Sequence, residues 1–71
     1  MRLEPVRCLL DYQLKRAGKK RSDLARDLRI DRRQLSQYAT MEAVMSLPIA
    51  VLIADYIGCS PRDLYEWTEV N

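Results

Sequence analysis

Histidine is absent from the 71-residue sequence, and cysteine and glycine occur only twice each. Without histidine, the chain lacks the usual general base and the usual partner of a nucleophilic side chain. Cys8 and Cys59 stand apart, so they complete neither a zinc site nor a disulfide framework. Gly18 and Gly58 make no glycine-rich phosphate loop. We therefore expect no enzyme, no metal and no cofactor, and a cytosolic protein with two reduced thiols.

Long apolar runs are also missing from the chain. The longest, "LPIAVLIA", stops at Asp55, well short of the ~18 residues of a membrane helix. The N-terminal stretch turns polar at Asp11, which predicts no secretory leader. We interpret residues 1–71 as one domain. So short a chain buries only ~60% of its unfolded surface, which favours a partner that adds buried area.

Charge is present but unevenly placed. Residues 15–33 hold nine lysines and arginines against three aspartates, a net charge of +6, whereas residues 34–71 hold one arginine against five acids, a net charge of −4. A basic segment on a nearly neutral protein indicates a polyanion as partner. The alternative is an ordinary solvated face.

Apolar spacing predicts five short helices and no strand, hence an all-α fold. The predicted helices cover residues 4–17, 21–28, 32–40, 47–57 and 61–67. Asp31 is the expected N-cap of the third helix, with Gln34 closing a capping box. Ser46 and Ser60 are the expected caps of the last two helices.

The second and third predicted helices are joined by residues 29–31 alone. So short a connection forces a steep crossing, the helix-turn-helix geometry, with a small residue such as Ala25 at the contact. The third helix then buries Leu35 and Tyr38. It turns its other side outward, at positions that enter a major groove in this motif. The outward side chains are Arg32, Arg33, Ser36 and Gln37.

With these features in place, the sequence resembles the Cro/repressor-type helix-turn-helix regulators, also called the xenobiotic-response-element type. "SDLARDLRIDRRQLSQY" (residues 22–38) is similar to the motif core, and "SLPIAVLIADYIGCSPRDLYEW" (residues 46–67) is similar to the two helices that follow it. The ending resembles small prophage and mobile-element regulators. The resemblance covers about residues 6–67. It implies a lambda-repressor-like fold, sequence-specific binding of double-stranded DNA and a role as a small transcriptional repressor.

The sequence departs from the family pattern at two positions. Arg29 stands in the turn where the family commonly has glycine, and Thr40-Met41 stands where it usually has Asn-Gly. A left-handed conformation at Arg29 would cost ~1–2 kcal/mol.

The resemblance implies a set of DNA contacts. Forked arginine donors match guanine, and glutamine amides match adenine. The implied base-reading residues are Arg32, Arg33, Gln34 and Gln37. The implied backbone contacts are Lys20, Arg21, Ser22 and Ser36. Gln34 has a rival role in the capping box, Ser22 a rival role as a cap, and plain solvent exposure is the alternative for the arginines and Ser36.

Regulators of this kind typically bind inverted repeats as symmetric dimers. Residues 47–57 are apolar nearly all round, so we expect the helix to be buried on two faces. The expected core-facing residues are Leu47, Ala50, Val51, Ala54 and Ile57. The dimer-interface candidates are Ile49, Leu52, Ile53 and Tyr56, with Tyr65 and Trp67 from the C-terminal end. Alternatively, the aromatic C-terminal residues cover this stripe within one chain.

A second functional class stays open on the sequence alone. The same fold serves protein-interaction modules such as antitoxins or anti-repressors, because fold does not fix function. The acidic and aromatic ending "DLYEWTEVN" is a candidate tail for a protein partner.

Overall fold

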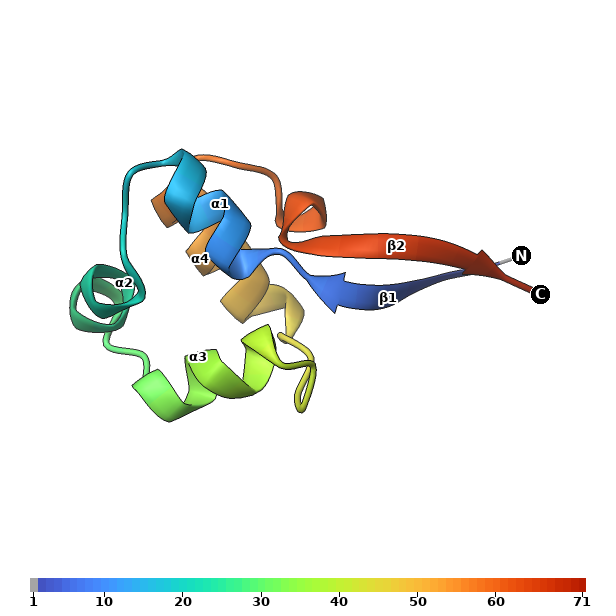
Figure 1. The fold of residues 1–71 in the computed structure, drawn as a ribbon, viewed down its shortest axis with the longest axis horizontal. Helices are drawn as coiled ribbons and strands as arrows, with labels where there is room; N and C mark the ends of the chain where they lie inside the picture. The colour runs from blue at the N-terminus through green and yellow to red at the C-terminus, as the bar shows by residue number, and fades with distance from the viewer. Residues whose placement is uncertain (1) are drawn as a thin grey trace.

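The computed structural model describes residues 2–71, in which four α-helices are flanked by two paired strands. The elements are β1 (Arg2–Cys8), α1 (Leu10–Arg16), α2 (Arg21–Leu28), α3 (Arg32–Ala39), α4 (Leu47–Ile57), the 3-10 helix η1 (Pro61–Leu64) and β2 (Tyr65–Val70). The helices form one body, and β1 and β2 run out from it as a ribbon (Figure 1).

The all-α prediction is wrong, because the two ends of the chain pair as an antiparallel sheet. Leu3 lies opposite Glu69 and Pro5 opposite Trp67, and a bulge follows Pro5. The predicted first helix begins only at Leu10, since residues 4–8 of the predicted range are in β1. The predicted fifth helix is reduced to the single turn η1, since the chain then becomes β2.

Local chemistry explains the ribbon. β2 reads "YEWTEV", in which tyrosine, tryptophan, threonine and valine are strong strand formers. Pro5 is tolerated in β1 because a strand of a two-stranded sheet has one free edge that needs no donor. Tyr65 anchors the base of the ribbon, since its buried hydroxyl accepts the Met45 backbone N–H at 3.0 Å.

The central helices match their predicted bounds closely. α2 and α4 span the predicted residues, and α3 ends at Ala39, one residue early. The Asp31 carboxylate caps α3 by accepting the Arg33 backbone N–H at 2.9 Å. The Ser46 hydroxyl caps α4, and Ser60 caps η1. Side-chain caps of this kind satisfy backbone donors that have no partner inside the helix.

One core joins all four helices to the base of the ribbon. Its buried members are Leu10, Leu14, Leu24, Ile30, Leu35, Tyr38, Met45, Ala50, Ile53, Ala54, Leu64 and Tyr65. Gln13 is the buried polar side chain among the described residues, and its amide donates to the Asp63 carbonyl at 3.0 Å. This bond and the Leu9 N–H to Leu64 carbonyl bond of 2.7 Å fix α1 against η1.

The predicted core face of α4 is only partly right. Ala50 and Ala54 are buried as expected, but Leu47 is 72% exposed and Val51 is also exposed. Ile53, expected on the second stripe, is completely buried. The helix is apolar nearly all round, so its sequence does not select the buried face. No helix within residues 2–71 combines the length and the apolar character needed to cross a bilayer.

Candidate nucleic-acid interface

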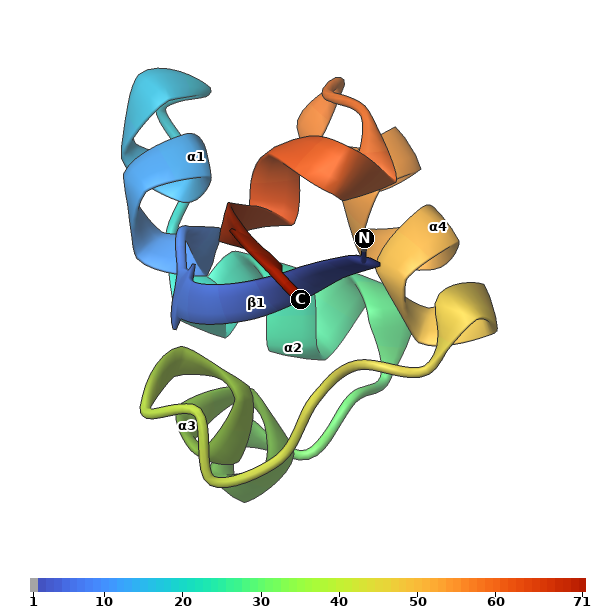
Figure 2. The ribbon, with the colours of Figure 1, turned by 90° about the vertical axis from the view of Figure 1, so that its right-hand side faces the viewer.

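Helices α2 and α3 form the predicted helix-turn-helix unit. Figure 1 views α2 nearly along its axis and α3 from the side, so the two helices cross steeply, and Figure 2 shows the same pair after a quarter turn. Arg29 is left-handed in the turn, with φ 56° and ψ 45°. This conformation reverses the chain and lets the Ile30 N–H reach the Ala25 carbonyl at 3.1 Å.

Two buried side chains fix α3 to the rest of the domain. Leu35 is completely buried and Tyr38 nearly so, while Ala25 and Leu28 of α2 pack partly buried against the same core. The helix therefore presents one face to the protein and the opposite face to solvent. A rigid mounting of this kind is what an element that reads a surface needs.

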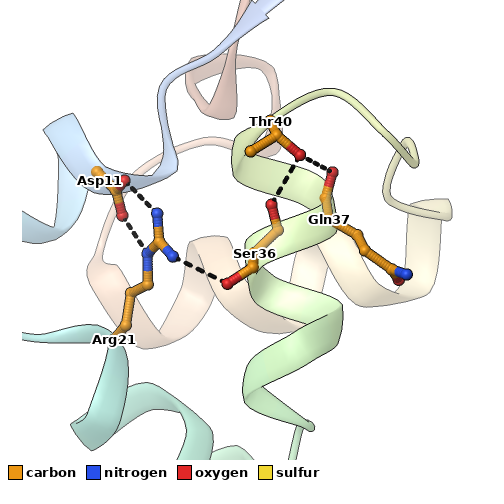
Figure 3. A network of polar contacts seen from close by, with 5 residues as sticks. All are labelled: Asp11, Arg21, Ser36, Gln37 and Thr40. Carbon is orange, nitrogen blue, oxygen red and sulfur yellow. Dashed lines mark hydrogen bonds and ion pairs between the residues drawn. The ribbon is translucent and has the colours of Figure 1, made fainter.

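The arginines at the start of α3 lie on its solvent face. Arg32 and Arg33 are exposed, and no carboxylate of residues 2–71 forms an ion pair with either of them. Their guanidinium donors are therefore available to a ligand. Gln37, one turn further along, is half-buried, and its amide points away from the contacts made by Ser36 (Figure 3).

Gln34 is engaged within the protein. Its amide nitrogen donates to the Tyr38 hydroxyl one turn along α3, and the residue is half-buried. The capping box predicted between Asp31 and Gln34 does not form, because the amide turns toward Tyr38 instead of back toward the cap. Asp31 nevertheless caps the helix by itself.

The N-terminus of α2 carries the predicted backbone-contact residues. Lys20 and Ser22 are exposed there. Lys20, and not Ser22, occupies the N-cap position, and its backbone N–H donates to the Asp23 carboxylate at 3.2 Å. The Ser22 hydroxyl is therefore not used as the cap of this helix.

Arg21 connects three helices (Figure 3). Its Nε and Nη2 atoms each donate to the Asp11 carboxylate of α1 at 2.6 Å, and its Nη1 donates to the Ser36 hydroxyl of α3 at 3.3 Å. The hydrogen bonds from Arg21 hold the pKa of Asp11 below its usual range, and the same bonds raise the pKa of Arg21. Both groups are therefore charged at neutral pH.

Sequence reasoning missed two residues of this network. Asp11 was not assigned a role, because nothing in a local pattern relates it to Arg21 ten residues away. Thr40 was expected as the last residue of the third helix and was given no side-chain role, but its hydroxyl donates to the Ser36 carbonyl at 3.0 Å and completes the end of α3 (Figure 3). Threonine directly after a helix is a signal that could have found this contact.

Lys19 also has a local role that its charge alone did not suggest. Its ammonium group lies 4.1 Å from the centre of the Tyr56 ring and donates to the Tyr56 carbonyl at 2.9 Å. The Tyr56 hydroxyl in turn donates to the Asp27 carboxylate of α2. These contacts hold α4 against α2, and they occupy the polar groups of Tyr56.

The six dimer-interface candidates fall into two groups. Ile53 and Tyr65 are core residues, and Ile49 and Tyr56 are half-buried. Leu52 and Trp67 are the members that remain exposed. Trp67 stacks edge-on against Tyr65, with ring centroids 5.9 Å apart, and borders an apolar hollow that also includes Val44 and Leu47.

No curated protein and no solved structure matches the chain. A family model does match, over residues 10–69, and it describes the Cro/C1-type HTH DNA-binding domain. That range takes in all four helices and nearly all of β2. The chain therefore belongs to the Cro/C1-type helix-turn-helix family of DNA-binding domains.

Proposed function

We propose that this protein is a small transcriptional repressor that reads a specific duplex sequence with α3 in the major groove. The single observation that carries the proposal is the state of Arg32 and Arg33. Both are exposed at the first turn of α3 and free of ion pairs within residues 2–71, on a helix fixed by buried Leu35. Bidentate arginine–guanine contacts are the commonest specific contacts to DNA, and the first turn of this helix is where they occur.

The other α3 and α2 residues take graded roles in this proposal. Gln37 is the third base-reading residue. Gln34 would have to release Tyr38 before it could contact a base, so we rank it below the others. Lys20 and Ser22 contact phosphates from the start of α2. Phosphate contacts set the position of the protein without choosing the sequence.

The proposed active form is a homodimer on an inverted-repeat operator. A single module buries too little DNA surface for tight specific binding. Large apolar side chains are exposed around one hollow of about 290 Å³ between the start of α4 and the ribbon. Among them are Leu47, Val44 and Trp67, of which Leu47 is the most exposed at 72%. Contiguous exposed apolar surface of this kind marks protein contacts, and we assign a second copy of the chain to it.

Sedimentation equilibrium tests the dimer. We expect wild-type protein to dimerise, Leu47→Glu to be monomeric, and Val6→Glu, which changes an exposed residue of the ribbon bulge, to dimerise normally. A monomeric wild type would refute the homodimer. Such a result would favour a different protein partner for the same surface.

Binding measurements with two variants test the reading role. Arg33→Ala should cost ~1–3 kcal/mol of operator affinity and relax the choice of base at one position. Lys20→Ala should weaken binding about equally on all sequences and reduce the salt slope by about one. The two variants are matched in charge loss, so electrostatics alone cannot produce the difference. Equal weakening by Arg33→Ala on all sequences would exclude direct base reading by this residue.

A further inference from the structure

A hollow of about 440 Å³ lies beside the proposed base-reading side of α3. Arg33 and Gln37 line it from α3. Ala43 and Val44 line it from the connection between α3 and α4, and Ile49 lines it from the first turn of α4. The hollow therefore combines the hydrogen-bonding groups of two proposed base readers with an apolar wall that comes from outside the helix-turn-helix unit.

Val44 is an exposed apolar side chain on a fixed stretch of backbone. The residue is 58% exposed. On one side of it, the Ala43 N–H donates to the Gln37 carbonyl at 3.1 Å. On the other side, the Met45 N–H donates to the hydroxyl of buried Tyr65 at 3.0 Å, and the Met45 side chain is itself in the core. The position of Val44 relative to α3 is therefore set before any ligand binds.

The chemistry of the hollow suits one group of the DNA bases. In the major groove the base edges carry hydrogen-bonding groups and one kind of apolar group, the C5 methyl of thymine. A single exposed valine is ordinary on a protein surface and needs no explanation by itself. Val44 differs because it shares a hollow with Arg33 and Gln37, so bases that these two contact bring a neighbouring base pair to the valine.

We propose that Val44 contacts the C5 methyl group of a thymine next to the base pair that Arg33 reads, and that this contact selects thymine at that position. The inference rests on the proposed DNA-reading function and deepens it. It adds a specificity-determining residue from the connection after α3, for which the family resemblance implies no base contact. Burial of the two apolar groups against each other favours the complex.

The first arm of the test removes the methyl group alone. The probe is the duplex enriched by selection from random DNA, with each thymine of a half-site replaced singly by deoxyuridine. Deoxyuridine keeps the hydrogen-bonding edge of thymine and lacks its methyl group. At the position next to the guanine assigned to Arg33, the replacement should weaken binding of the wild-type protein about fourfold, which equals ~0.8 kcal/mol for one buried methyl group.

The second arm combines the same pair of duplexes with Val44→Ala. This variant should bind the thymine and deoxyuridine duplexes equally, because the methyl group has lost its partner. Val44 also borders the hollow assigned to a second copy of the chain, but an effect on dimerisation is common to both duplexes and cancels in their ratio. The matched control Val6→Ala shortens an exposed valine of β1 outside the α3 hollow and should keep the wild-type difference.

The outcomes separate this contact from the proposed function. A loss on deoxyuridine that is seen with the wild type and Val6→Ala, and not with Val44→Ala, supports the contact. Three results would each overturn it while DNA reading stands. They are an enriched site with no thymine beside the guanine of Arg33, equal binding of both duplexes by the wild type, and an undiminished loss with Val44→Ala. Failure of the wild-type protein to bind any duplex specifically would overturn both proposals.

Discussion

Replacing Arg29 by glycine should stabilise the domain. Arg29 is an exposed residue with φ 56° in the turn between α2 and α3. A left-handed conformation costs a residue with a Cβ about 1–2 kcal/mol, and glycine avoids this cost. Glycine also makes the unfolded chain more flexible, which offsets about 0.5–1 kcal/mol. The expected net gain is about 0.5–1 kcal/mol, and each kcal/mol raises the Tm of a domain of this size by about 4–8 °C.

The matched control for this variant is Arg29→Ala. Alanine removes the same positive charge and the same side chain but keeps the Cβ, so it keeps the backbone strain. Urea and thermal unfolding followed by circular dichroism should place Arg29→Gly above Arg29→Ala in stability. A glycine variant no more stable than the alanine variant would refute the strain argument, because relief of charge repulsion would then explain any gain.

Two further predictions concern polar contacts. Tyr65→Phe should lower the free energy of unfolding, measured in urea, by ~1–3 kcal/mol, because the buried Met45 N–H loses its acceptor. Unchanged stability would show that another acceptor replaces the hydroxyl. The pKa of Asp11 is lowered by hydrogen bonds from Arg21. The stability due to Asp11 is therefore complete above the ordinary aspartate pKa of about 3.9 and is lost as the pH falls through the lower, folded-state value. Acid titration of thermal stability should show a smaller loss for Asp11→Asn, and identical acid curves would contradict the assignment.

The elements that the sequence predicts correctly are those with local signals. Asp31 and Ser46 cap α3 and α4, and Gly58 ends α4 in a left-handed conformation at φ 93°. Each signal lies within a few residues of the boundary that it sets. The left-handed turn at Arg29 was also predictable, because a three-residue connection leaves the chain few ways to reverse.

The ribbon could not be predicted in the same way. β1 and β2 pair residues at opposite ends of the chain, from Arg2 with Val70 to Cys8 with Tyr65. Neither strand is stable alone, since a strand is stabilised by its cross-strand neighbours. The periodicity of residues 4–17 suits a helix, and only pairing with β2 makes residues 4–8 a strand instead. The alternation in "YEWTEV" was the one local sign of a strand.

The residues of the candidate site also differ in whether local sequence patterns predict their contacts. The exposure of Arg32 and Arg33 follows from helical periodicity around buried Leu35. The ion pair of Arg21 with Asp11 depends on how α1 and α2 pack, which local patterns do not contain. The Gln34–Tyr38 bond is a pair of residues one helical turn apart, so it was accessible to sequence reasoning and was overlooked.

Selection of binding sites from random duplex DNA, analysed for both sequence and symmetry, tests the central claim most directly. The account predicts enrichment of an inverted repeat whose half-sites lie about one helical turn apart, with guanines at the positions nearest Arg32 and Arg33. Binding that falls with salt but enriches no sequence would contradict the reading role of α3.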